Sequence, residues 1–127
     1  MKKFSKIEYV RTDMEVEKEK VRAYTEALKN VKSYEELRGL FMEEKAREDV
    51  WATMAEVAQV RYTVDTRDSF YEGEVQFWNE TVPAIRLLMQ KAEKAILESP
   101  FIKEFAEEFG DFFVKNMEVG QKLADDC

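Results

Sequence analysis

The sequence contains no histidine and a single cysteine, Cys127, which is its last residue. The lack of histidine excludes Ser-His-Asp triads, Cys-His pairs and the His-Glu-x-x-His zinc motif from these 127 residues. A lone cysteine excludes thiolate metal sites and an internal disulfide, and this is typical of proteins from a reducing compartment. We therefore expect no catalytic residue, no metal ligand and no cofactor site in this chain.

Glycine and proline are also scarce, with four and two residues. So few turn-forming residues favour long helices over many short strands. The longest unbroken apolar run is three residues, too short for a transmembrane helix or for the core of a signal peptide. We therefore expect a cytoplasmic protein that does not bind a membrane.

The formal net charge of the chain is −7. This charge repels phosphate backbones, so nucleic acid is not an expected partner. Hydrophobic residues make up 45% of the chain and charged residues 37%, which is typical of a folded globular protein. The length predicts a single domain over residues 1–127.

Apolar residues recur at helical spacing along most of the chain. Asp13 is placed to cap a first helix of about five turns, and Ser33 with Glu36 forms a capping box for one long helix over residues 34–64. A polar link over residues 65–69 follows, in which Asp65 or Thr66 is expected to cap a third helix and close an antiparallel hairpin.

The third helix has the clearest pattern, with apolar residues alternating in steps of four and three between residues 71 and 96. Pro83 lies within it and is expected to kink it near Asn79. Ser99-Pro100 predicts the start of another helix that ends at Gly110, and a last helix covers residues 111–124. The predicted fold is all-α, an antiparallel array of long helices with one kinked at Pro83.

Two groups of residues stand out as candidate sites, the paired carboxylates and a set of phenylalanines. The carboxylate pairs are interpreted as solvated helix faces: Glu35-Glu36, Glu43-Glu44, Glu107-Glu108 and Asp125-Asp126. Five phenylalanines near the end of the chain have two interpretations, either a core layer or a docking face for a partner: Phe101, Phe105, Phe109, Phe112 and Phe113. They lack the basic surface that stacking on nucleic acid requires.

The sequence around the predicted hairpin is more specific than the pattern of an amphipathic helix alone requires. It includes Arg61 and Arg67 around the motif Asp65-Thr66-x-Asp68-x-Phe70-Tyr71, and continues through residues 74–83 to Ser99-Pro100-Phe101. Together with residues 4–14 and 27–36, it resembles the N-terminal helical region of the oligoendopeptidase F family of bacterial zinc metallopeptidases. The hairpin residues are interpreted as structural, with a salt bridge that ties the hairpin together; the alternative is that an arginine here clamps a substrate carboxylate.

The resemblance implies a role without catalysis. In that family a larger part follows this region, and there a His-Glu-x-x-His helix and a further Glu bind zinc and hydrolyse short peptides. The N-terminal helices help to wall the peptide channel. No part of the zinc motif is present here, so the resemblance carries over no ligand or base. The expected partner is the missing catalytic region.

Two other interpretations stay open at this point. The chain could be a free-standing helical interaction module that self-associates or binds a partner through its five phenylalanines. It could also be an enzyme that uses carboxylates alone.

Overall fold

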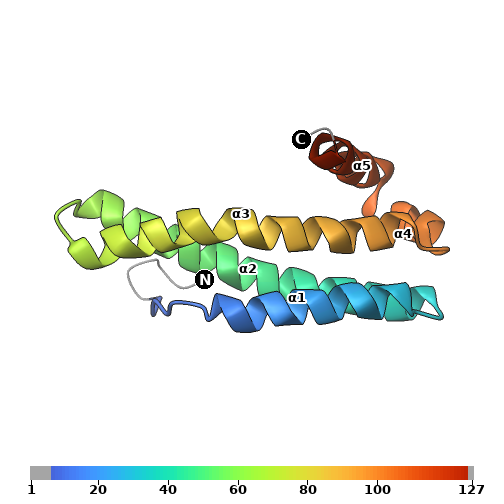
Figure 1. Ribbon diagram of the computed structural model, residues 1–127, viewed down its shortest axis with the longest axis horizontal. Helices are drawn as coiled ribbons and strands as arrows, with labels where there is room; N and C mark the ends of the chain where they lie inside the picture. The colour runs from blue at the N-terminus through green and yellow to red at the C-terminus, as the bar shows by residue number, and fades with distance from the viewer. Residues whose placement is uncertain (1–6, 126–127) are drawn as a thin grey trace.

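Five helices make up the computed structural model, which describes residues 7–125 (Figure 1). They are α1 (Met14–Lys29), α2 (Tyr34–Val64), α3 (Ser69–Leu97), α4 (Ile102–Phe109) and α5 (Asp111–Asp125). The described part of the chain contains no strand. The all-α prediction is confirmed, while the parts of the predictions that fall on residues 4–6, Asp126 and Cys127 lie outside the described residues.

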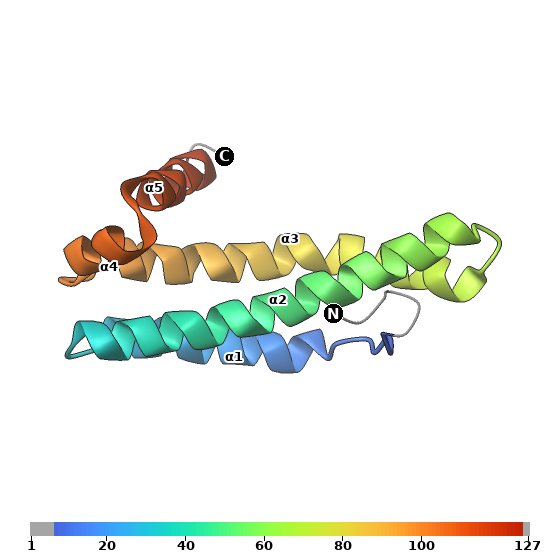
Figure 2. The ribbon, with the colours of Figure 1, turned by 180° about the vertical axis from the view of Figure 1, so that it is seen from behind.

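The first three helices lie side by side in alternating directions (Figures 1 and 2). α3 contacts both α1 and α2, and α1 also contacts α2. The short α4 turns at the end of α3, and α5 then lies on the side of α3 away from α1, in contact with α3 and α4 (Figure 2). The predicted antiparallel array of long helices is therefore confirmed.

Most helix ends lie where the capping residues predict them. Asp13 Oδ1 accepts a hydrogen bond from the Val16 amide at 3.4 Å at the start of α1, and Ser33 Oγ accepts one from the Glu36 amide at 3.2 Å at the start of α2. α2 runs unbroken from residue 34 to residue 64. Gly110 ends α4 with φ 100°, a conformation that favours glycine.

The cap of α3 differs from the expectation. Asp68, not Asp65 or Thr66, caps the helix, since its Oδ1 accepts from the amides of Phe70 at 2.9 Å and Tyr71 at 3.4 Å. Asp65 instead accepts from the Arg67 amide at 3.0 Å within the link. Either aspartate has the chemistry of a cap, and the length of the turn decides between them.

Two further helix predictions have different outcomes. α4 begins at Ile102 rather than at Pro100, because Ser99 Oγ accepts from the Phe101 amide at 3.1 Å and holds a turn ahead of the helix. α3 continues through Pro83 as one helix, and the kink near Asn79 stays a prediction.

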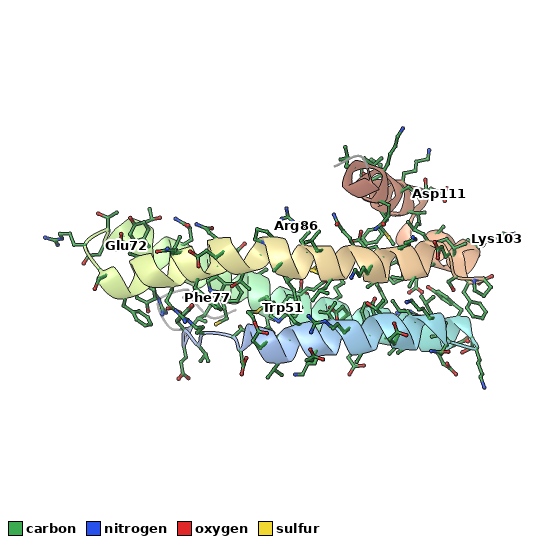
Figure 3. All side chains as sticks on the ribbon, in the orientation of Figure 1. Trp51, Glu72, Phe77, Arg86, Lys103 and Asp111 are labelled. Atoms are coloured by element: carbon green, nitrogen blue, oxygen red, sulfur yellow. The ribbon has the colours of Figure 1, made fainter. Side chains whose placement is uncertain are left out.

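The core consists of two apolar clusters along the bundle. One joins the start of α1 to the second half of α2 and the first half of α3, and it contains the buried Trp51 and Trp78. Figure 3 shows Trp51 between the helices. The other joins the end of α1 to the start of α2, the end of α3 and the last two helices, and it contains the fully buried Phe105.

One carboxylate pair is not solvated throughout, which corrects the expectation for Glu43-Glu44, while Glu107 and Glu108 are both exposed. Glu44 is only 3% exposed. Its ion pair with Arg47, one turn later on the same helix, offsets part of the cost of burying the charge. Glu108 of the pair Glu107-Glu108 accepts hydrogen bonds from the Tyr34 hydroxyl and, at 2.6 Å, from Arg38 Nε. These contacts tie α4 to the start of α2.

Candidate functional site

Residues at the α2–α3 hairpin hold together the end of the bundle that lies opposite α4. Arg61 near the end of α2 donates through Nη1 to the Tyr71 hydroxyl at 2.9 Å and through Nη2 to the Ile7 carbonyl. The Tyr9 ring packs edge-on against the rings of Phe70 and Tyr71. The segment over residues 7–9 is therefore fastened across the tip of the α2–α3 hairpin.

A second set of contacts continues this network along α3. The Tyr9 hydroxyl donates to Glu74 Oε1 at 2.7 Å and accepts from Trp78 Nε1 at 3.1 Å. Arg11 donates to Glu74 through Nε and Nη2, and its guanidinium lies 4.3 Å from the centre of the Phe77 ring. We call these five residues, together with Arg61, Phe70 and Tyr71, the hairpin-end network.

The network keeps Glu74 charged although this residue is 4% exposed. The hydrogen bond from Arg11 lowers the pKa of Glu74 below its ordinary value, and the Tyr9 hydroxyl acts in the same direction. Burial and the neighbouring Glu74 raise the pKa of Tyr9 to about 12. An anchored carboxylate and an unreactive phenol are typical of a structural network, not of an acid–base pair.

The remaining hairpin residues are at the link itself. Arg67 Nε lies 3.3 Å from Asp65 Oδ1, and the two side chains are 92% and 51% exposed. Such an exposed ion pair contributes little to stability. Asp68 serves as the cap of α3. The structure therefore gives the hairpin motif fastening and capping contacts.

Four of the five phenylalanines near the end of the chain pack against the bundle, although only Phe105 is buried and Phe113 stays 38% exposed. Phe105, Phe109 and Phe113 surround Phe41 of α2, with ring centres 4.8–6.0 Å from that ring. We call these four residues the aromatic cluster. Phe105 has no exposed surface, and Phe101 also packs against this core. The aromatic cluster is thus the layer that attaches α4 and α5 to the three long helices.

Phe112 is the exception, since 78% of it is exposed. Val119 and Leu123 follow it on α5 at steps of seven and four and are 55% and 61% exposed. These spacings place the three residues on one face of the helix. We call them the α5 stripe, an apolar face of α5 with no described element against it.

A cavity of about 200 Å³ lies between α2, α3 and α5. Its walls combine apolar side chains, among them Met89 and Met117, with the carboxylates of Glu44, Glu48 and Glu93. Burial raises the pKa of all three, and the neighbouring Glu44 and Glu93 help to bring that of Glu48 to about 7. We call this the carboxylate cavity.

Sequence reasoning missed the carboxylate cavity, although a signal for it exists. Leu37, Phe41, Glu44, Glu48 and Trp51 follow one another in steps of four, three, four and three. This is the spacing of a buried helical seam, and two glutamates occupy the middle of it. The run of charge over residues 43–49 concealed the seam.

The chain's residues do not fit a zinc site. The sequence has no histidine, and the described residues contain no group of three or more Asp, Glu, Cys or His side chains that could hold a metal ion. Within the same part of the chain, no helix is both long and apolar enough to cross a membrane.

Residues 4–124 match the model of the Peptidase M3 N-terminal domain. The chain belongs to this family. No curated protein matches the sequence.

Three solved structures contain the same fold. One is Pz peptidase A with an inhibitor, with a TM-score of 0.89, 27% sequence identity and 94% of this chain covered. Another is named as an oligoendopeptidase F, with a TM-score of 0.90, 25% identity and 96% coverage. The third, named as an oligoendopeptidase F from Bacillus anthracis str. Ames, has a TM-score of 0.80, 27% identity and 96% coverage.

The matched region is a small part of each of these proteins. It covers 21%, 22% and 25% of their chains. The resemblance to the N-terminal helical region of oligoendopeptidase F, first indicated by the hairpin motif, is therefore confirmed, and the catalytic part of such peptidases is not among these residues.

Proposed function

We propose that this domain is the non-catalytic helical part of an M3-type zinc peptidase that hydrolyses short peptides. Its role is to form one wall of the compartment in which the catalytic part acts on the peptide. The zinc ion and the base that activates water belong to that catalytic part, because this chain supplies neither. The observation that carries the proposal is the family match over residues 4–124.

The α5 stripe supports a contact with a further part of the protein. Exposed apolar side chains at helical spacing are typical of a face that another element covers. The stripe lies on the helix that projects from the three-helix bundle (Figure 2). The missing catalytic region is the expected partner, joined in the same chain or supplied as a second one.

The decisive experiment is to read the coding DNA beyond the Cys127 codon. A frame that continues to a His-Glu-x-x-His codon pattern supports the proposal. A stop codon directly after Cys127 contradicts the version in which both parts share a chain. If, in addition, no nearby gene encodes a catalytic part, the proposal as a whole is contradicted. The purified 127-residue chain is expected to show no zinc-dependent cleavage of a quenched peptide. Cleavage that a zinc chelator abolishes would contradict this expectation.

The α5 stripe also favours a second candidate, a helical module that self-associates. Light scattering on the purified chain tests it, with Phe112→Glu and Leu123→Glu as the variants that should give a monomer if a dimer forms. Both residues are exposed, so the substitutions do not disturb the core. A folded monomer before mutation contradicts self-association.

The remaining expectations follow from the same reasoning. A cytoplasmic location agrees with the single cysteine, and a bacterial source agrees with the oligoendopeptidase F relative from Bacillus anthracis. Fractionation of the source cells, with detection of this chain by mass spectrometry, tests both.

A further inference from the structure

A groove of about 790 Å³ lies between α1 and α3. Its lining comes from the second half of α1, the end of α3 and the links that follow these two helices. No residue of α2 lines it, and α2 packs on the other side of the helix pair (Figures 1 and 2). We call this the α1–α3 groove. Its volume falls within the range of about 300–1,000 Å³ that is typical of ligand sites.

The lining of the α1–α3 groove includes apolar surface that is open to a ligand. Leu28 and Ala95 are buried in the lining. Val31 and Leu88 are half-buried, and Pro100 is exposed. A ligand that covers these three side chains removes apolar surface from water, which favours binding. The groove therefore suits a ligand that has apolar groups.

Positive side chains outnumber negative ones in the lining, although the net charge of the whole chain is −7. The four cations are Arg22, Lys29, Lys91 and Lys94, and the two carboxylates are Glu26 and Glu98. Each carboxylate pairs with a lysine one turn away, Glu26 with Lys29 at 3.2 Å and Glu98 with Lys94 at 4.0 Å. These four charges balance one another, so two positive charges remain.

The two remaining charges lie on opposite sides of the groove. Arg22 of α1 pairs with Glu19, whose exposed side chain is outside the lining. Lys91 of α3 is exposed, and no ion pair of this residue is found among the described residues. A carboxylate between Arg22 and Lys91 would meet two cations and no competing acid of the lining. Complementary charge of this kind favours an anionic ligand.

The length of the groove suits an extended peptide. At 1.5 Å per residue, α1 advances about 10 Å from Arg22 to Lys29, and α3 with its cap advances about 15 Å from Leu88 to Glu98. An extended chain advances about 3.3 Å per residue, so three to five residues span this length. A small inorganic anion would leave the apolar lining uncovered. A nucleic acid would meet Glu26 and Glu98 as well as the cations.

We propose that the α1–α3 groove binds a short acidic peptide in an extended conformation. Its carboxylates pair with Arg22 and Lys91, and its apolar side chains pack on Leu88, Val31 and Pro100. The occupant is a free peptide, since a peptide combines the acidic and the apolar groups that the groove requires. The inference goes beyond the proposed function, because the site lies wholly within this chain and needs no catalytic part.

The test uses the 127-residue chain and a blocked pentapeptide in which leucine and glutamate alternate, with leucine at both ends. Isothermal titration calorimetry and NMR of the isotope-labelled chain follow binding at low salt. Saturable binding with a Kd on the order of 1 mM is expected, because the cations are exposed to solvent. The same peptide with glutamine in place of glutamate should bind about tenfold more weakly, and with lysine it should not bind. Added salt should weaken only the glutamate peptide.

Variants locate the site. Arg22→Gln and Lys91→Gln should each weaken binding of the glutamate peptide by about threefold to tenfold, since each removes one of the unbalanced charges. Arg86→Gln is the matched control, because Arg86 is exposed and Figure 3 shows it on the side of α3 away from α1. This control should change the Kd by less than about twofold. The double variant Arg22→Glu with Lys91→Glu should bind the lysine peptide in place of the glutamate peptide.

The outcomes separate the proposal from simpler explanations. NMR shifts are expected at lining residues such as Thr25, Ala95 and Ser99, and shifts confined to other surfaces overturn the proposal. Equal affinity for the glutamine peptide, or equal losses in Lys91→Gln and Arg86→Gln, also overturns it. So does a lack of saturable binding.

Two controls complete the test. Sodium octanoate has a carboxylate and an apolar chain without a peptide backbone, and binding of octanoate in the absence of peptide binding overturns the peptide as occupant. Circular dichroism shows whether each variant is folded, and Arg22→Gln and Lys91→Gln test the two sides of the groove separately if one of them is not. The coding DNA decides the proposed function, so its failure is distinct from a failure of these titrations.

Discussion

Arg11 holds Glu74 with two nitrogens, although 63 positions separate them in the sequence: Nε lies 2.9 Å from Oε1, and Nη2 pairs with Oε2. This two-point contact fastens the segment ahead of α1 to the first turns of α3. The guanidinium also lies over the Phe77 ring, and Figure 3 shows Phe77 on the side of α3 toward that segment. Arg11 thus closes the end of the bundle opposite α4.

We expect Arg11→Ala to lower the free energy of unfolding by about 1–3 kcal/mol, because Glu74 would stay buried without its main partner. Urea denaturation followed by circular dichroism measures the change. Arg22→Ala is the matched control, since Arg22 and Glu19 form an exposed pair within one helix and its loss should cost less than about 0.5 kcal/mol. Equal losses in the two variants would show that the buried pair has no special role.

The phenylalanines near the end of the chain should differ sharply in their contributions. Phe105→Ala is expected to cost about 3–5 kcal/mol, because the residue is fully buried in the aromatic cluster. Phe112→Ala should change the free energy of unfolding by less than about 0.5 kcal/mol, because most of it is exposed. The same urea titration measures both, and a large loss in Phe112→Ala would mean that a partner covers the α5 stripe in solution.

Local signals predicted most of the fold. Asp13, Ser33 and Gly110 mark helix ends because each meets a geometric need of the backbone at a terminus. The link between α2 and α3 has two suitable aspartates, Asp65 and Asp68, and only the three-dimensional course of the turn selects the second.

The candidate site was harder to predict because it depends on contacts between distant residues. The sequence shows five phenylalanines together, but only packing against Phe41 of α2 reveals which of them are core. Likewise, Glu44 resembles its solvated neighbours until Arg47 and the seam position of Glu44 are seen together. Charge patterns report average exposure, and single buried carboxylates escape them.

Two glycines should respond in opposite directions to alanine. Gly110 adopts φ 100° and ψ 146°, a conformation open almost only to glycine, so Gly110→Ala should cost about 1–3 kcal/mol. Gly39 lies exposed within α2, and a methyl group there would meet nothing within 4 Å. Gly39→Ala should therefore raise the free energy of unfolding by about 0.5–1 kcal/mol. Thermal denaturation of both variants beside the wild type checks the two signs.

The carboxylate cavity should make the protein less stable as the pH rises toward neutrality. The pKa of Glu48 is about 7 in the folded state against an ordinary value of 4.5, so between these values the folded state binds more protons than the unfolded state. Stability is therefore lost as the pH rises from about 4.5 to about 7, and Glu44 and Glu93, whose pKa values are also raised, act in the same direction. Glu74 and Glu108 have lowered pKa values, so their opposite effect falls below this window.

Glu48→Gln isolates this effect. The variant should match the wild type near pH 5 and exceed its free energy of unfolding at pH 7.5 by on the order of 1 kcal/mol, a figure that allows for solvent screening of a half-buried group. Urea titrations at half-unit steps from pH 5 to pH 7.5 measure the two slopes, with Glu56→Gln as the exposed control that keeps the wild-type slope. If the slope survives in Glu48→Gln, then Glu48 is not the group that titrates, because a glutamine cannot take up the proton.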